Sequence, residues 1–166
     1  MRVGIGWDVH RLEKGCCLIV GGVIVSQDLR AIAHSDGDVL AHALIDALLG
    51  AAGLGDIGSF FPETEENKGM RSIDALRKIV KIIRKLGYGI ESVDSTVVVS
   101  GVKLSPFRDQ IVGNLEGILS CPVSVKFKSA NGVGDVGKGK AIEAMVAVLL
   151  SEGIEERTDE ELRKGE

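Results

Sequence analysis

The chain is organised around one stretch, His34-Ser35-Asp36-Gly37-Asp38-Val39-Leu40-Ala41-His42. Ser35 or Asp36 can cap a helix that begins here and continues to about Ala52, where Gly53 ends it. Small and apolar residues fill most of this helix, so we expect it to be buried against the rest of the domain.

A group of metal-capable side chains extends from this stretch. Asp38, His42 and Asp46 are spaced four apart, so they line one helix face. Asp8 and His10 are two apart at the end of a predicted strand, so they point the same way. Asp8, His10 and His42 make three N/O ligands, the number in a catalytic zinc site with one open position. Spacing alone leaves the alternative of histidines satisfied within the core.

The two other acidic residues of the helix are expected to have structural roles. Asp38 can place a negative charge in the first turn, which suits the helix dipole. Asp46 lies one turn after His42 and can orient its ring, or it can be an ordinary solvated aspartate.

Length and composition restrict the class of protein. The 166 residues suffice for one domain with a sizeable core, and 45% hydrophobic content excludes disorder. We expect no membrane span, because no apolar run reaches about eighteen residues. A net charge of −4 and 4% aromatic residues disfavour nucleic-acid binding.

The cysteines and the start of the chain favour a cytoplasmic protein. No signal or transit segment is expected before the first strand. Cys16, Cys17 and Cys121 fit neither a disulfide framework nor a zinc ribbon, and the adjacent pair is interpreted as packing residues.

The predicted fold is one α/β (α+β) domain, in which helices pack on one face of a mixed sheet. Strands are predicted over 2–9, 18–25 (two short strands or one bent strand), 90–100 and 122–128. Helices are predicted over 36–52, from a Ser72 cap to Gly87, from Ser105-Pro106, and over 140–150. The remaining segments are a connection over 26–33, a long loop over 56–69, of a kind that is often functional, and a glycine-rich turn over 131–139.

A second candidate site lies around the glycine-rich turn. Exposed amides and lysines beside Ser129 and Asn131 suit a phosphate group, although a solvated turn is an equally simple interpretation. Lys103 has the same two interpretations. The lysines of the turn are Lys126, Lys128, Lys138 and Lys140.

Several motifs together resemble one known family. They are Gly-x-Gly-x-Asp-x-His at 4–10, Gly21-Gly22-Val23, Ala33–Val39, Ala41–Leu44, Asp46–Ala51, Leu54–Gly58 and Phe61-Pro62. From Met1 to about Leu150 the chain resembles 2-C-methyl-D-erythritol 2,4-cyclodiphosphate synthase. The resemblance implies a homotrimer of domains spanning 1–151. Residues 152–166, which the resemblance does not cover, are predicted to form a charged tail.

The resemblance also implies a reaction of the non-mevalonate isoprenoid route. 4-Diphosphocytidyl-2-C-methyl-D-erythritol 2-phosphate is converted to the cyclic diphosphate and CMP, a phosphorus–oxygen lyase reaction in which the 2-phosphate attacks the β-phosphorus. Asp8, His10 and His42 match the Zn²⁺ ligands, with a β-phosphate oxygen in the fourth position. His34 and Ser129 match groups that stabilise the transition state, and Mg²⁺ or Mn²⁺ accompanies the diphosphate.

Substrate contacts are implied for nineteen positions: Asp8, His10, His34, Ser35, Asp56, Ile57, Gly58, Phe61, Glu63, Glu65, Ser100, Gly101, Val102, Lys103, Leu104, Lys128, Ser129, Asn131 and Lys138. In the family, those from Ser100 onward come from a neighbouring subunit. Where the family has a glutamate for the second ion, this chain has Asn131, and Asp135 is the alternative ligand. Two other functions remain: a trimeric binding or regulatory protein without turnover, and a zinc phosphoesterase.

Overall fold

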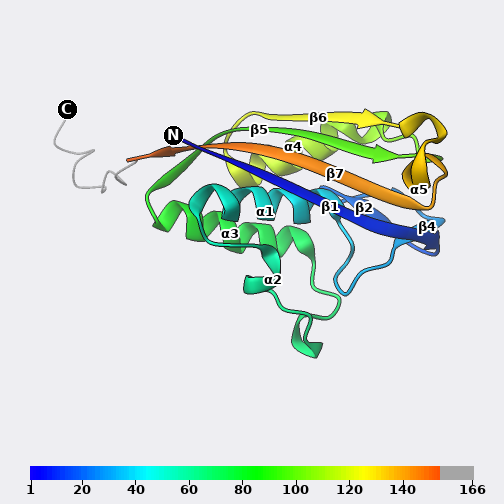
Figure 1. Ribbon diagram of the computed structural model, residues 1–166, viewed down its shortest axis with the longest axis horizontal. Helices are drawn as coiled ribbons and strands as arrows, with labels where there is room; N and C mark the ends of the chain where they lie inside the picture. The colour runs from blue at the N-terminus through cyan, green and yellow to red at the C-terminus, as the bar shows by residue number, and fades with distance from the viewer. Residues whose placement is uncertain (154–166) are drawn as a thin grey trace.

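A mixed five-stranded sheet forms the framework of the computed structural model, which describes residues 1–153 (Figure 1). The strand order is β4-β1-β7-β5-β6, in which only β5 and β6 are parallel. The strands are β1 (Arg2–Lys14), β4 (Leu29–Ala31), β5 (Tyr88–Val99), β6 (Val123–Lys128) and β7 (Ala141–Glu152). A separate two-stranded sheet pairs β2 (Leu18–Val20) with β3 (Val23–Ser26).

The longer helices cover one face of the large sheet, as predicted (Figure 1). α1 packs on β1 and β7, α3 packs on α1, and α4 packs on β6. These helices are α1 (Val39–Ala52), α3 (Ser72–Lys85) and α4 (Arg108–Leu119), and the short ones are α2 (Ile57–Phe60) and α5 (Gly134–Gly137). Three 3₁₀ turns complete the described chain: η1 (Glu65–Asn67), η2 (Ser105–Phe107) and η3 (Ala130–Gly132).

Asp38, rather than Ser35 or Asp36, caps α1, so that detail of the sequence prediction was wrong. The Asp38 carboxylate accepts hydrogen bonds from the N–H groups of Ala41, Gly21 and Gly22 at 3.1, 2.9 and 2.6 Å. Asp38 is fully buried, and burial raises the pKa of its carboxyl although the three N–H groups oppose the shift. The expected structural role of Asp38 is therefore confirmed: it ties the start of α1 to the turn between β2 and β3.

The predicted closing helix over 140–150 is wrong, because this segment is β7, the central strand between β1 and β5 (Figure 1). Ile142, Ala144, Val146, Val148 and Leu150 are buried at every second position, which is the period of a strand. The residues between them are also largely apolar, so the sequence does not show the alternation of apolar and polar residues that marks a strand. The alanines and leucines of the segment, which favour helices, led to the helix prediction. Pairing on both edges of the strand overrides that local preference.

Other boundaries differ in smaller ways. The first strand continues to Lys14, and the predicted connection over 26–33 contains β4. The predicted loop over 56–69 contains α2 and η1, and the turn over 131–139 contains α5 and overlaps the end of η3. Ser72 is the first residue of α3 rather than its cap, since Arg71 occupies that position without a side-chain bond.

The adjacent cysteines were wrongly interpreted as packing residues. A disulfide bond joins Cys16 to Cys17 in the connection between β1 and β2, and Cys16 is exposed. Cys121 is the free cysteine of the described chain and lies in the core. The predicted tail over 152–166 lies almost wholly outside the described residues. No helix within residues 1–153 has the length and apolar character needed to cross a membrane.

Candidate metal centre and active site

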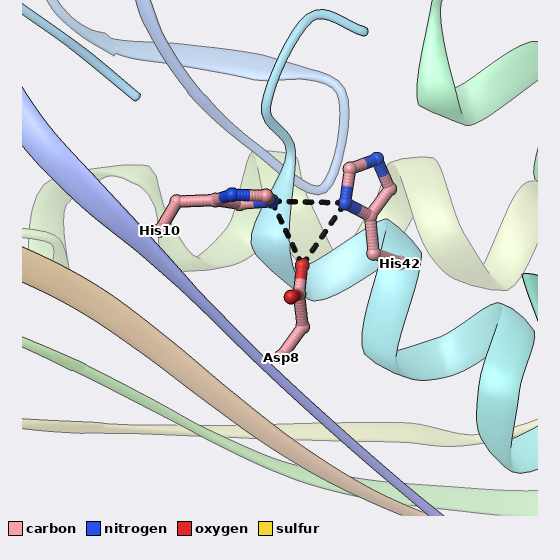
Figure 2. A group of neighbouring side chains, drawn as sticks. All are labelled: Asp8, His10 and His42. Carbon is pink, nitrogen blue, oxygen red and sulfur yellow. Dashed lines mark hydrogen bonds and ion pairs between the residues drawn. The ribbon is translucent and has the colours of Figure 1, made fainter. Parts of the chain in front are cut away.

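The candidate metal ligands lie on strand β1 of the sheet and on helix α1, which packs against that strand. The Asp8 carboxylate Oδ2 lies 2.9 Å from His10 Nε2 and 2.9 Å from His42 Nδ1, and the two ring nitrogens are 3.1 Å apart. Figure 2 shows all three side chains pointing toward one another. The predicted clustering is therefore confirmed, and its donor set of two imidazoles and one carboxylate can hold a divalent metal ion.

The electrostatics of the cluster favour a cation. Burial disfavours the charged form of Asp8, but hydrogen bonds and charge interactions with His10 and His42 outweigh it and hold the pKa of Asp8 well below its ordinary value. Burial also opposes a charged His42 ring, yet the bond and charge of Asp8 outweigh it and raise the pKa of His42. Asp8 therefore supplies an ionised ligand at neutral pH.

The cluster opens into a cavity of about 320 Å³ that brings together most of the predicted residues from the first half of the chain. His34, Ser35, Ile57, Gly58, Phe61 and Glu63 line it beside the three ligands. Six further lining residues were not predicted: Ile32, Ala33, Asn67, Met70, Ser72 and Ala75. They lie next to predicted segments, but only folding reveals that α3 closes the cavity.

His34 has a defined orientation at this cavity. Its Nε2 atom lies 2.7 Å from the carbonyl oxygen of Thr64, and because a carbonyl only accepts, Nε2 carries the hydrogen of this bond. The backbone N–H of Gly69 donates to the carbonyl oxygen of His34 at 2.9 Å. The loop over 56–69 therefore holds His34 from both sides.

Asp56 and Glu65 belong to the same loop but do not line the cavity. Asp56 caps α2 and accepts bonds from the Ser59 hydroxyl and N–H at 2.8 and 3.0 Å, which lower the pKa of its carboxyl. Glu65 lies exposed in η1 and pairs with Lys68.

Asp46 neither orients His42 nor remains simply solvated, so both sequence interpretations were wrong. Its Oδ1 accepts a 2.7 Å hydrogen bond from the backbone N–H of Ile57, the first residue of α2. Partial burial raises the pKa of Asp46 although this bond opposes the shift. Asp46 therefore anchors the segment that carries Ile57 and Gly58 at the cavity.

The predicted residues from the second half of the chain form a separate group. The Ser100 hydroxyl donates to the carbonyl oxygen of Ser129 at 3.2 Å, so the loop after β5 meets the turn after β6. Leu104 is buried, and Lys126 pairs with Asp94. None of these predicted positions lines the cavity of the same chain: Ser100, Gly101, Val102, Lys103, Leu104, Lys128, Ser129, Asn131 and Lys138.

Fold and site together define a mixed-sheet α+β protein with a candidate divalent-metal centre. The sequence model described as YgbB family matches residues 1–151, and the chain belongs to this family, whose curated relatives are named 2-C-methyl-D-erythritol 2,4-cyclodiphosphate synthase. The synthase of Thermotoga maritima is 49% identical over 153 residues, covering 92% of this chain and 93% of the relative. Because the relatives are synthases, the chain is an enzyme.

Solved structures agree with this assignment. A CDP-bound form of 2C-methyl-D-erythritol-2,4-cyclodiphosphate synthase has a TM-score of 0.83 at 35% identity, covering 90% of this chain and 100% of the other. The CDP complex of IspF from Plasmodium falciparum has a TM-score of 0.81 at 34% identity, covering 92% and 96%.

Proposed function

We propose that this enzyme converts 4-diphosphocytidyl-2-C-methyl-D-erythritol 2-phosphate to 2-C-methyl-D-erythritol 2,4-cyclodiphosphate and CMP. The observation that carries the proposal is the Asp8–His10–His42 cluster at a cavity shared with His34, in a chain whose relatives are named for this product. Structures of similar proteins hold CDP, the leaving half of such a substrate together with its β-phosphate. The reaction would place the chain in isoprenoid precursor synthesis by the non-mevalonate route, as a phosphorus–oxygen lyase.

The metal ligands are assigned to Zn²⁺. Asp8, His10 and His42 would hold the ion, which supplies Lewis-acid stabilisation of phosphoryl oxygens when bound. Two neutral imidazoles and one carboxylate balance only one of its two positive charges, so the centre keeps a net positive charge for an anionic phosphate group.

The protein's own residues bind and orient the substrate. The nucleophilic 2-phosphate and the β-phosphorus belong to one molecule, so holding the substrate folded supplies much of the rate. His34 and Ser129 are assigned to stabilise the charge that develops at phosphorus. Ser35, Asp56, Ile57, Gly58, Phe61, Glu63 and Glu65 are assigned to the methylerythritol part.

We also propose a homotrimer in which two chains complete each site. The cavity of one chain lacks the Ser100–Leu104 and Lys128–Lys138 residues, which are assigned to the cytidine and phosphates and can be supplied by a neighbour. The sheet face opposite the helices supports this arrangement, because Val3, Ile5, Trp7 and Met145 are exposed on it by 45–76%. An apolar face of this kind is a typical association surface.

The proposal also covers the second metal ion, the extent of the catalytic domain and the location of the enzyme. Mg²⁺ or Mn²⁺ would accompany the diphosphate, residues 1–151 would form the catalytic domain with 152–166 as a tail, and the enzyme would act in the cytoplasm.

Product analysis with the diphosphocytidyl substrate tests the function. Wild type is expected to release CMP together with the cyclic diphosphate, and His42→Ala is expected to release neither. Binding without turnover would instead identify a binding protein, and release of inorganic phosphate from simple esters would identify a zinc phosphoesterase; either result overturns the proposal.

A further inference from the structure

We infer that Ser72, backed by Asp36, is a positioning residue that fixes which nitrogen of His42 faces the metal. The inference rests on the proposed metal centre and deepens it. His42 presents Nδ1 to Asp8 and His10, while its other nitrogen, Nε2, points away from the cluster. There Nε2 lies 2.8 Å from the hydroxyl oxygen of Ser72.

The proton of the Ser72 hydroxyl has a defined destination. Ser72 Oγ donates a short hydrogen bond to Asp36 Oδ1, and the Ser72 backbone N–H donates to Asp36 Oδ2 at 3.1 Å. An ionised carboxylate only accepts hydrogen bonds, so the hydroxyl proton is committed to Asp36. The Ser72 oxygen then remains as an acceptor toward His42.

The direction of the hydrogen bond between Ser72 and His42 determines which ring nitrogen of His42 carries hydrogen. If Ser72 accepts, Nε2 of His42 must carry a hydrogen, and in a neutral ring the lone pair then lies on Nδ1. Nδ1 is the nitrogen that faces Asp8 and His10. The hydrogen bonds from Asp36 through Ser72 to His42 therefore leave the free lone pair of the ring at the position of the metal. Metal-bound histidines generally donate their second ring N–H to a fixed acceptor, which sets the ring orientation.

Burial makes Ser72 the main candidate for this role, although Ser35 is a second neighbour. Ser35 Oγ lies 3.0 Å from His42 Nε2, but it also accepts a hydrogen bond from the Gly37 N–H at 3.2 Å. Unlike Ser72, it does not donate its hydroxyl hydrogen to a carboxylate within residues 1–153. Ser72 is only 1% exposed, so water cannot readily replace its oxygen. Ser35 can partly compensate, which limits the expected loss when Ser72 is replaced.

The sequence separation explains why this role was not predicted. Asp36 and Ser72 are 36 residues apart, and the start of α3 is placed beside the stretch before α1 by the bond from the Asp36 N–H to the Met70 carbonyl. Ser72 had been interpreted as a helix cap, and its hydroxyl instead serves the neighbouring helix.

The test measures zinc affinity by chelator competition in the full chain. Ser72→Ala is expected to weaken zinc binding about tenfold to a hundredfold, the usual effect of losing such a partner. Asp36→Asn offers only one acceptor oxygen to the two donors of Ser72, so it is expected to weaken zinc binding in the same direction. Ser95→Ala is the matched control, because Ser95 is 2% exposed and its hydroxyl donates to the Ser124 carbonyl on the sheet. The control should bind zinc as wild type does.

A second readout follows the ring hydrogen itself. Nitrogen NMR of the zinc-loaded protein, which has three histidines, should show hydrogen on Nε2 of His42 with slow exchange in wild type and faster exchange in Ser72→Ala. Equal zinc affinity in wild type, Ser72→Ala and Asp36→Asn would overturn the inference, as would an equal loss in Ser95→Ala. Failure of wild type to bind zinc would instead overturn the proposed metal centre. Asp36→Asn keeps the test decisive if Ser72→Ala fails to fold.

Discussion

Gly6 on β1 lies directly against the backbone of Ala43 on α1: a Cβ atom at Gly6 would stand only 1.8 Å from the Ala43 carbonyl oxygen. Gly6 precedes Asp8 by two residues, and Ala43 follows His42. The absence of a side chain therefore lets the strand and the helix approach closely enough for their ligands to meet. The same requirement explains Gly4, where a Cβ would stand 1.9 Å from the Ala47 carbonyl oxygen.

Replacing Gly6 with alanine should damage both the fold and the metal centre. The methyl group would push α1 away from β1, at a cost of about 3 kcal/mol, the upper end for overpacking a core. We expect denaturant unfolding to show this loss and zinc affinity to fall with it. Gly50→Ala on the exposed side of α1 is the control, because nothing lies within 4 Å of its added methyl group and alanine favours a helix by about 1 kcal/mol. Equal stability of the two variants would contradict the close-approach argument.

The metal-free protein should lose stability as the pH rises above about 6.5, the ordinary His value. The folded pKa of His42 is raised, so its contribution is fully present below the unfolded pKa and disappears as the pH passes through the folded pKa. Asp8 does not interfere, since its lowered pKa means that its contribution is lost only in strong acid. Melting temperatures of metal-free wild type and His42→Gln should therefore converge as the pH rises. A gap that stays constant with pH would show that His42 and Asp8 are not coupled in this way.

Trimer formation should depend on the exposed apolar face of the sheet. Ile5 is 76% exposed in one chain, and Ile5→Lys would place a charge in the proposed interface, where it must be desolvated. Light scattering should show monomers that still bind zinc but have lost turnover. Ile24→Lys is the matched control, because Ile24 is 46% exposed on the separate small sheet. A fully active Ile5→Lys monomer would rule out a site shared between chains.

How much of this site can be predicted from the sequence depends on how far apart in the chain the contacting residues lie. Asp8 and His10 were identified because they share one face of a strand, and His42 because it lies on the polar face of the first helix, so folding only had to bring these two elements together. The helix over 140–150 failed because its partners, β1 and β5, lie far away in the chain, and pairing with them decides that it is a strand.

The same reasoning explains the missed polar contacts. Asp46 bonds to Ile57 and Ser72 bonds to Asp36, and in neither case does the sequence spacing reveal the partner. Hydroxyl and carboxylate groups of this kind have many local alternatives, including caps and solvent, so only the packed helices select one.

Removing the Asp46 carboxylate should loosen substrate binding without affecting the metal. Asp46→Ala leaves the Ile57 N–H without its acceptor, and because this donor is only part-buried the cost is about 1 kcal/mol, the low end of the range for an unsatisfied group. Because Ile57 begins α2, we expect a higher KM with unchanged zinc content. Asp46→Asn can retain an acceptor oxygen and should lie closer to wild type. Loss of zinc in Asp46→Ala would instead support the earlier idea that Asp46 orients His42.

The second divalent ion should be bound more weakly than in relatives with a glutamate at the position of Asn131. Mg²⁺ is usually held by one or two carboxylates together with substrate phosphates, and an amide oxygen lacks the charge. Asn131 is exposed in a left-handed backbone conformation, φ 48°, and its side-chain oxygen accepts a 3.2 Å bond from the Ser129 hydroxyl. That bond places the amide beside a residue assigned to the transition state, so a carboxylate at 131 would meet the phosphates there.

Three variants separate Asn131 from Asp135 as the source of the ligand. Asn131→Glu should lower the Mg²⁺ concentration that gives half-maximal turnover, whereas Asn131→Gln, of equal length but neutral, should not. Both replacements bear the same backbone cost of about 1–2 kcal/mol in the left-handed region, so their difference isolates the charge. Asp135 lies exposed in the first turn of α5, and Asp135→Ala should change the Mg²⁺ requirement little. If Asn131→Glu has no effect and Asp135→Ala abolishes the Mg²⁺ dependence, Asp135 is the ligand, because its carboxylate already supplies the charge that position 131 lacks.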